Sequence, residues 1–230
     1  MKRVLLISIF FLFLGGATIG QSPVTGMLPA DRLMVDIFTD VWQNTPDGMS
    51  TNTINRGITI SMMKDFPLGS SSFSFAAGAG FTGHNLYSDH YYTYDDTDGR
   101  YFDFVPIDET EGEIKKNKLS LNYLNVPLEI RFRTGTAPRT MRVTAGLRAG
   151  VLVNAHTKHH FEFEDDDYPE EIEYKLHQLD NIEAFRLGVT ARVGYGRFNI
   201  NAYMPLTNIF EGNTVEDMNF FSVGLTLSLY

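Results

Sequence analysis

One stretch of sequence decides the fold: Met141-Arg-Val-Thr-Ala-Gly-Leu-Arg-Ala-Gly-Val-Leu-Val-Asn-Ala155. Apolar residues occupy every second position from Met141 to Val153, and arginine, threonine or glycine fills the positions between them as far as Gly150. Successive side chains of a β-strand point to opposite faces, so a period of two separates an apolar face from a polar one. The stretch therefore predicts a strand at the boundary between an apolar and a polar environment.

Seven further stretches alternate in the same way, which gives eight predicted strands: 33–42, 57–66, 72–82, 120–133, 141–155, 185–195, 198–204 and 221–229. The connectors are alternately short (67–71, 134–139, 195–198) and long (43–55, 85–117, 156–181, 208–217). An antiparallel chain built this way collects its turns at one end and its loops at the other. The sequence therefore predicts an all-β fold, an eight-stranded antiparallel up-and-down barrel.

The polar face of these strands favours a barrel in a membrane. It is rich in Gly, Ser and Thr, whereas the solvated face of a soluble barrel or sandwich usually carries many Lys and Glu. Aromatic residues on the apolar face flank the short turns, as is typical of a lipid headgroup boundary: Phe66, Phe73, Phe132, Tyr195 and Phe198. We therefore expect a transmembrane β-barrel of the outer membrane, with its short turns and both termini in the periplasm.

Two local features interrupt the alternation. The segment 120–123 places apolar residues on both faces, which predicts a register break there. Pro127 and Pro205 fall inside predicted strands although proline cannot donate a hydrogen bond to a ladder, so we expect bulges or barrel rims at these positions.

The first residues predict export. Lys2 and Arg3 precede an apolar run at 4–14, and small residues at Thr18 and Gly20 mark a cleavage site, so we expect a signal peptide at 1–20 and a barrel domain at 21–230. The chain has no cysteine and a net charge of −9, which excludes disulfides and argues against nucleic acid as a partner. No cofactor is predicted.

The polar face also carries a group of charges that would lie in the barrel lumen: Asp36, Asp40, Asp65, Glu129, Arg131, Arg133, Arg142, Arg148, Arg186 and Arg192. Charges in a narrow barrel are stable only when they are paired, and the planar guanidinium fits a carboxylate. We expect an ionic plug that fixes the strand register. The alternative is an anion-binding lumen, since arginines outnumber carboxylates by six to four. Eight strands leave little room for an open pore.

The two longest predicted loops are acidic, with a net charge of −6 at 85–117 and −7 at 156–181. They also contain many aromatic residues, which are enriched where proteins recognise partners. We expect these residues either to bind a partner or to pack on one another and stiffen the loops: Tyr87, Tyr91, Tyr92, Tyr94, Tyr101, Phe102, Phe104, Phe161, Phe163, Tyr168 and Tyr174.

Two kinds of chemistry find weaker support. His156 and His160 would share a face of a strand and are the candidate metal ligands, with His177 as a further ligand, although a solvated loop stem explains them as well. For catalysis, no histidine falls at a lumen position inside a predicted strand, so no nucleophile–His–acid set can form. We expect no enzyme activity.

Three segments resemble the PorT-like outer-membrane β-barrel proteins of Bacteroidota-type bacteria: Tyr123-Leu-Asn-Val-Pro-Leu-Glu-Ile-Arg-Phe132, Gly146-Leu-Arg-Ala-Gly150 and Phe220-Phe-Ser-Val-Gly-Leu-Thr-Leu-Ser-Leu-Tyr230. The resemblance implies an OmpX/OmpA-like architecture. It also implies that the barrel-assembly machinery reads the last strand at Val223, Leu225, Leu227 and Tyr230. Some PorT-like proteins assist a protein-secretion machine.

From these observations we expect a small outer-membrane barrel with a structural or interaction role. Its long loops would dock another envelope or secretion-complex protein or a surface ligand. The alternatives are a barrel that binds a small anion or a metal ion, and a narrow channel.

Overall fold

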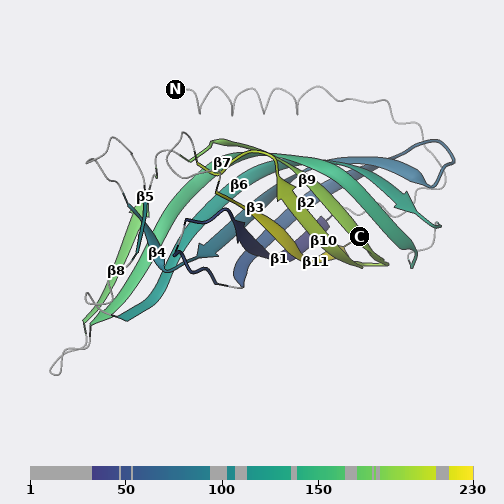
Figure 1. Cartoon of the computed structure of the whole chain (residues 1–230). Coiled ribbons are helices and arrows are strands. Elements are labelled where there is room, and N and C mark those ends of the chain that lie inside the picture. The colour runs from purple at the N-terminus through teal and green to yellow at the C-terminus, as the bar shows by residue number, and fades with distance from the viewer. Residues whose placement is uncertain are drawn as a thin grey trace.

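The computed structural model describes residues 33–46, 48–52, 54–93, 103–106, 113–135, 139–163, 170–177, 179, 182–210 and 218–229. These residues form eleven strands (Figure 1): β1 Leu33–Gln43, β2 Asn55–Pro67, β3 Phe73–Tyr87, β4 His90–Thr93, β5 Asp103–Pro106, β6 Glu113–Arg133, β7 Met141–Phe163, β8 Glu170–His177, β9 Phe185–Tyr195, β10 Phe198–Pro205 and β11 Asn219–Leu229. No helix within these ranges is long and apolar enough to cross a membrane.

Eight of these strands close into an antiparallel barrel in the order β1, β2, β3, β6, β7, β9, β10 and β11. The first and last strands pair along their whole length, from Leu33 opposite Leu229 to Gln43 opposite Asn219, and this ladder closes the ring. Gly196 supplies the positive φ of 62° that the two-residue turn between β9 and β10 requires. The structure confirms the predicted eight-stranded up-and-down barrel.

The two faces of the barrel strands differ as the alternation predicts. Outward side chains are apolar and exposed, as in Leu225 at 66% and Phe198 at 73%, while the inward residues Asp36, Thr226 and Glu129 are at most 2% exposed. A polar interior and an apolar exterior invert the arrangement of a soluble protein. This inversion is the arrangement of a transmembrane barrel, whose outer surface contacts lipid.

The predicted register break lies where β6 pairs with β7. Asn122 is opposite Asn154 but Tyr123 is opposite Leu152, so Val153 is an extra residue on β7. Inward positions on β7 are even-numbered below this bulge, as at Arg148, and odd-numbered above it, as at Thr157.

The expectation of a bulge at Pro127 is wrong. Pro127 pairs in register with Arg148 of β7, and no register shift occurs on either side of it. The ladder to β3 instead skips the positions opposite Gly78 and Ala79, because the missing N–H of proline leaves a gap without changing the register. Pro205 is the last residue of β10, which agrees with the expected rim position.

The long loops contain more regular structure than predicted. The 85–117 and 156–181 segments include the ends of β3, β6 and β7 and the whole of β4, β5 and β8. β6 and β7 remain paired up to Glu113 and Glu162, and β8 pairs with β7 from His156 opposite His177 to Phe163 opposite Glu170. Figure 1 shows this sheet continuing from one side of the barrel, with β4 and β5 beside it. We call the paired segments 113–120, 156–163 and 170–177 the blade.

Several predictions fall outside the described residues. They concern the signal peptide at 1–20 with its cleavage site at Gly20, the aromatic residues Tyr94, Tyr101, Phe102 and Tyr168, and the terminal Tyr230.

Candidate functional site

The lumen holds a continuous row of alternating cations and anions. In order along the row, the side chains are Arg133, Asp65, Arg131, Glu129, Arg192, Asp36 and Arg148. Arg131 donates to Asp65 Oδ1 at 2.7 Å and to Glu129 Oε2 at 2.7 Å, and each carboxylate accepts from two arginines. Sharing of this kind satisfies buried charges that would otherwise be strongly destabilising.

The strand order explains why these side chains meet. The carboxylates come from β1, β2 and β6, and the arginines come from β6, β7 and β9. In the eight-membered ring, β7 lies opposite β1 and β9 lies opposite β2. Asp36 of β1 therefore reaches across the lumen to Arg148 of β7 at 3.5 Å and to Arg192 of β9 at 3.4 Å. The row of ion pairs links opposite walls of the barrel.

Nearer the long loops, Asp40 binds two other partners. His84 Nδ1 lies 2.8 Å from Asp40 Oδ2, and Ser222 Oγ donates to Asp40 Oδ1 at 2.5 Å. The expectation that no histidine lies at a lumen position is therefore wrong, because β3 continues past the predicted end at residue 82. The carboxylate stands between the serine and the histidine, whereas a catalytic triad requires the histidine in the middle.

Arg186 occupies an aromatic cage at the same height. Its guanidinium carbon lies 4.1 Å from the ring centre of Phe220, 5.3 Å from that of Tyr123 and 5.2 Å from that of Tyr203. Aromatic faces stabilise a cation through their quadrupole. The sequence predicts Arg186 as a member of the ionic group but does not predict the cage, although Tyr123 and Tyr203 have the same inward parity as Asn125 and Asn201 on their strands.

The loop end of the barrel is filled by apolar side chains. Buried residues from the strand ends pack against residues of the connecting segments: Trp42, Met49, Leu86, Leu119, Leu121, Tyr123, Ala155, Leu179, Ile182, Ile209, Phe210, Met218 and Phe220. This cluster, which we call the apolar cap, seals the lumen on the side of the long loops.

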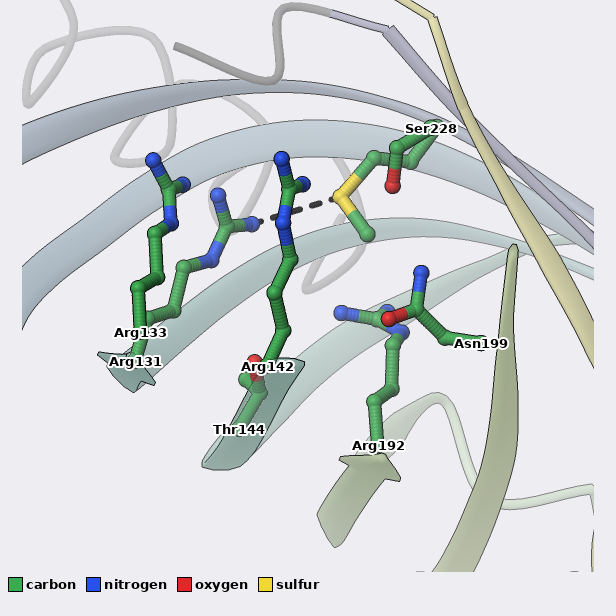
Figure 2. Close-up of a pocket in the computed structure, with 8 residues that line it drawn as sticks. Arg131, Arg133, Arg142, Thr144, Arg192, Asn199 and Ser228 are labelled. Atoms are coloured by element: carbon green, nitrogen blue, oxygen red, sulfur yellow. Dashed lines mark hydrogen bonds between the residues drawn. The ribbon is translucent and has the colours of Figure 1, made fainter. Parts of the chain in front are cut away.

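The turn end of the barrel contains a small pocket instead (Figure 2). Its enclosed volume of about 10 Å³ leaves room for about one water molecule. Its lining consists of Met34, Arg131, Arg133, Arg142, Thr144, Arg192, Asn199 and Ser228. Four of the lining side chains are arginines and none is a carboxylate, so the pocket presents hydrogen-bond donors and positive charge.

The structure places the predicted site residues unequally. All ten charged lumen residues lie inside the barrel, whereas the loop aromatics fall on separate elements: Tyr87 on β3, Tyr91 and Tyr92 on β4, Phe104 on β5, Phe161 and Phe163 on β7 and Tyr174 on β8. His156 is opposite His177 and His160 is opposite Glu173 in the β7–β8 ladder. No group of three or more His, Asp or Glu side chains in the described part of the chain is arranged to hold a metal ion.

Comparison with known families agrees with this architecture. Residues 29–211 match the family described as the outer membrane protein beta-barrel domain. The chain belongs to this family. Its membership places the closed ring of strands in the outer membrane, where the exposed apolar band contacts lipid. No curated protein and no solved structure matches the chain.

Proposed function

We propose that this outer-membrane barrel is a non-enzymatic docking protein whose blade binds an extended segment of another envelope protein. The blade stands at the loop end, which we place outside the cell because long loops of such barrels are extracellular. The PorT-like resemblance makes a component of a secretion complex one candidate partner.

The observation that carries this proposal is the length of β6 and β7. They contain 21 and 23 residues, about twice the 9–11 residues that a tilted strand needs to cross a bilayer. Above Val151 the second neighbour of β7 changes from β9 to β8, so the extra length is not used to close the ring. It builds a sheet that leaves the barrel.

The edge of this sheet suits an extended partner. Within the described residues, β8 is the last strand of the sheet, and an edge strand offers N–H and C=O groups that can pair with a further strand. The β8 sequence Glu-Glu-Ile-Glu-Tyr-Lys-Leu-His contains three glutamates and one lysine, which favours a basic partner segment.

The packed interior argues against the channel alternative. The ionic row crosses the lumen and the apolar cap closes its loop end, so side chains occupy the path that a solute would follow. Small barrels of this strand number are filled by side chains.

The proposal can be tested by removing the blade hairpin. Because His156 is opposite His177, a two-residue Asn-Gly turn can replace residues 157–176 and connect His156 to His177. The barrel, tagged near its mature N-terminus, is then extracted from native outer membranes in mild detergent. We expect a stoichiometric partner to co-purify with the unaltered chain and to be lost from the shortened chain.

A matched control replaces the 211–217 connector, at the same end of the barrel, with Gly and Ser. We expect this variant to keep the partner, and both variants to migrate as folded barrels on unheated gels. A partner that remains bound to the shortened chain, or no partner on the unaltered chain, would refute the docking proposal.

A further inference from the structure

The blade ends in a strand whose outer edge has no neighbouring strand among the described residues. β8 pairs with β7 along its whole length, from Glu170 to His177, and it is the last strand in the order of the sheet. The N–H and C=O groups on its other side are therefore available to a further strand, and native proteins usually cover or protect an edge of this kind.

The sequence of β8 alternates between ionisable and apolar residues. Its odd-numbered positions from 171 to 177 carry Glu, Glu, Lys and His, and its even-numbered positions from 172 to 176 carry Ile, Tyr and Leu. With a period of two, these two sets belong to opposite faces of a sheet. A strand that covers the edge therefore has to match charges on one face and apolar side chains on the other.

β8 is complementary to itself in the antiparallel register that is centred on Tyr174. In this register ionisable residues lie opposite ionisable ones, apolar residues lie opposite apolar ones, and each acid lies opposite a base. The opposite positions in the two copies are Glu171 and His177, Glu173 and Lys175, Ile172 and Leu176, and Tyr174 and its own copy. Pairs of opposite charge and pairs of aromatic or branched apolar residues stabilise antiparallel strands.

The neighbouring registers do not match in this way. A register centred on Glu173 places two glutamates opposite each other, and one centred on Lys175 places two lysines opposite each other. Like charges at directly opposite positions destabilise a pair of strands. A shift by one residue places ionisable residues opposite apolar ones, because it exchanges the two faces. Of these registers, only the one centred on Tyr174 matches both faces.

Two copies in one membrane can bring these edges together. Such copies are related by a two-fold axis along the membrane normal, so their β8 strands become antiparallel where the blade bends away from that normal. Figure 1 shows a bend of this kind: the sheet of β6, β7 and β8 curves away from the barrel, and β8 lies at its end.

We propose that β8 pairs with β8 of a second copy of this chain, in the antiparallel register centred on Tyr174, so that two blades form one continuous sheet. A two-fold contact of this kind closes after two copies. The pairing needs no other protein and does not depend on the docking proposal. A docking partner uses the same edge and displaces the second copy. The two proposals are tested separately, this one on the purified chain and the docking proposal on native membranes.

The first test makes use of the absence of cysteine from the chain. Tyr174→Cys, Ile172→Cys and Leu176→Cys are purified in neutral detergent, and disulfide-linked dimers are quantified after mild oxidation. We expect dimers of Tyr174→Cys to form at least about tenfold faster than those of the other two, because only position 174 lies opposite its own copy, where Cβ atoms are about 4.5–5.5 Å apart. Equal rates at the three positions, or no dimer from position 174, would overturn the proposal.

The second test reverses the charges. Lys175→Glu places two carboxylates opposite each other in both halves of the contact, and Glu173→Lys places two ammonium groups there. Each should weaken dimerisation by about tenfold or more in analytical ultracentrifugation of the purified chain at low ionic strength. The double variant Glu173→Lys, Lys175→Glu restores the opposite charges and should dimerise like the unaltered chain.

Arg139→Glu is the matched control, because Arg139 is exposed at the turn end of the barrel, away from the blade. We expect it to dimerise like the unaltered chain. Single reversals in β8 that have no more effect than Arg139→Glu, or a double variant that dimerises as weakly as the single ones, would overturn the proposal.

Discussion

Glu129 is the residue on which the ionic row depends most. It is 1% exposed, accepts hydrogen bonds from Arg131 and Arg192, and so joins the two halves of the row. Most buried arginines of the lumen stack or pair with groups from other strands, which means that these interactions act between strands distant in sequence. The paired interior therefore compensates the buried charges and also helps to specify which strands lie next to each other.

We predict that Glu129→Gln destabilises the barrel by about 3 kcal/mol, because two buried cations lose their shared anion. Urea unfolding in phospholipid vesicles measures the effect. The control Arg56→Gln removes an exposed charge of β2 and should change the free energy of unfolding by less than about 0.5 kcal/mol. Equal free energies of unfolding for the Glu129 variant and the unaltered chain would show that the ionic row does not stabilise the barrel.

At the scale of single residues, sequence analysis could predict which side chains face the lumen but not which ones meet. Parity alone places Asp36 and Arg192 inside the barrel. Their 3.4 Å contact depends on the closure of the ring, because it joins residues 156 positions apart. The aromatic cage of Arg186 could not be predicted, because inward parity places Tyr123 and Tyr203 in the lumen without showing that both rings contact the same guanidinium.

At several positions in the barrel strands, glycine allows adjacent strands to approach each other closely. A Cβ at Gly224 of β11 would overlap the carbonyl oxygen of Ile37 and lie 2.5 Å from the Cα of Phe38 on β1. We predict that Gly224→Ala weakens the closing β1–β11 ladder by about 1–3 kcal/mol, the usual effect of overpacking. Urea unfolding measures it.

Gly83→Ala serves as the matched control. The nearest atom to its added Cβ is the side-chain oxygen of Asn122 at 3.0 Å, which can move away. Equal destabilisation by the two substitutions would contradict the assigned close contact at the barrel seam.

β7 shows why some strands extend beyond their predicted ends. The bulge at Val153 reverses the inward parity, so the alternation that identified the strand stops although the strand continues to Phe163. The blade strands were missed for a related reason. A sheet outside the membrane has no lipid-facing side, and the charged, aromatic-rich sequences of β4, β5 and β8 lack the apolar and small-polar alternation of the barrel strands.

Stability of the blade should depend on pH through His159. This residue is buried between β6 and β8, and its burial lowers the pKa of the imidazole below the ordinary value of about 6.5. The unfolded blade then binds more protons than the folded blade, so the folded form is fully stable above about pH 6.5 and loses stability as the pH falls below it.

Hydrogen-exchange protection factors of β7 and β8 amides measure this effect. We predict that they decrease between about pH 7 and pH 5, while those of β1 and β11 change less. His159→Gln should remove most of the pH dependence. Protection factors in β7 and β8 that stay constant over this range would contradict the argument.

The whole molecule is an apolar band around a charged, filled interior, and one pair of substitutions tests the position of that band. Leu225 is 66% exposed in the middle of β11, and Leu206 is 59% exposed just beyond the loop-end rim of β10. We predict that Leu225→Arg destabilises the barrel in vesicles by about 2–4 kcal/mol and Leu206→Arg by about 1 kcal/mol or less, because the cost of arginine falls from midplane to interface. Equal effects on unfolding in vesicles would place the membrane elsewhere.

The two ends of the molecule differ in chemistry. One end carries the apolar cap and the blade, and the other carries the arginine-lined pocket. The ring, its polarity and its turns could be predicted from the sequence, because they follow from local alternation. The cap and the blade could not, since both arise where segments of several loops come together.

The central claim, that the blade docks another protein, is tested most directly by site-specific cross-linking in the native outer membrane. A photoreactive residue replaces Lys175, the exposed lysine of β8, and in a second variant it replaces lipid-facing Ile58 of β2. The account predicts one discrete protein adduct from position 175 and none from position 58. No adduct from position 175, or the same adducts from both positions, would contradict it.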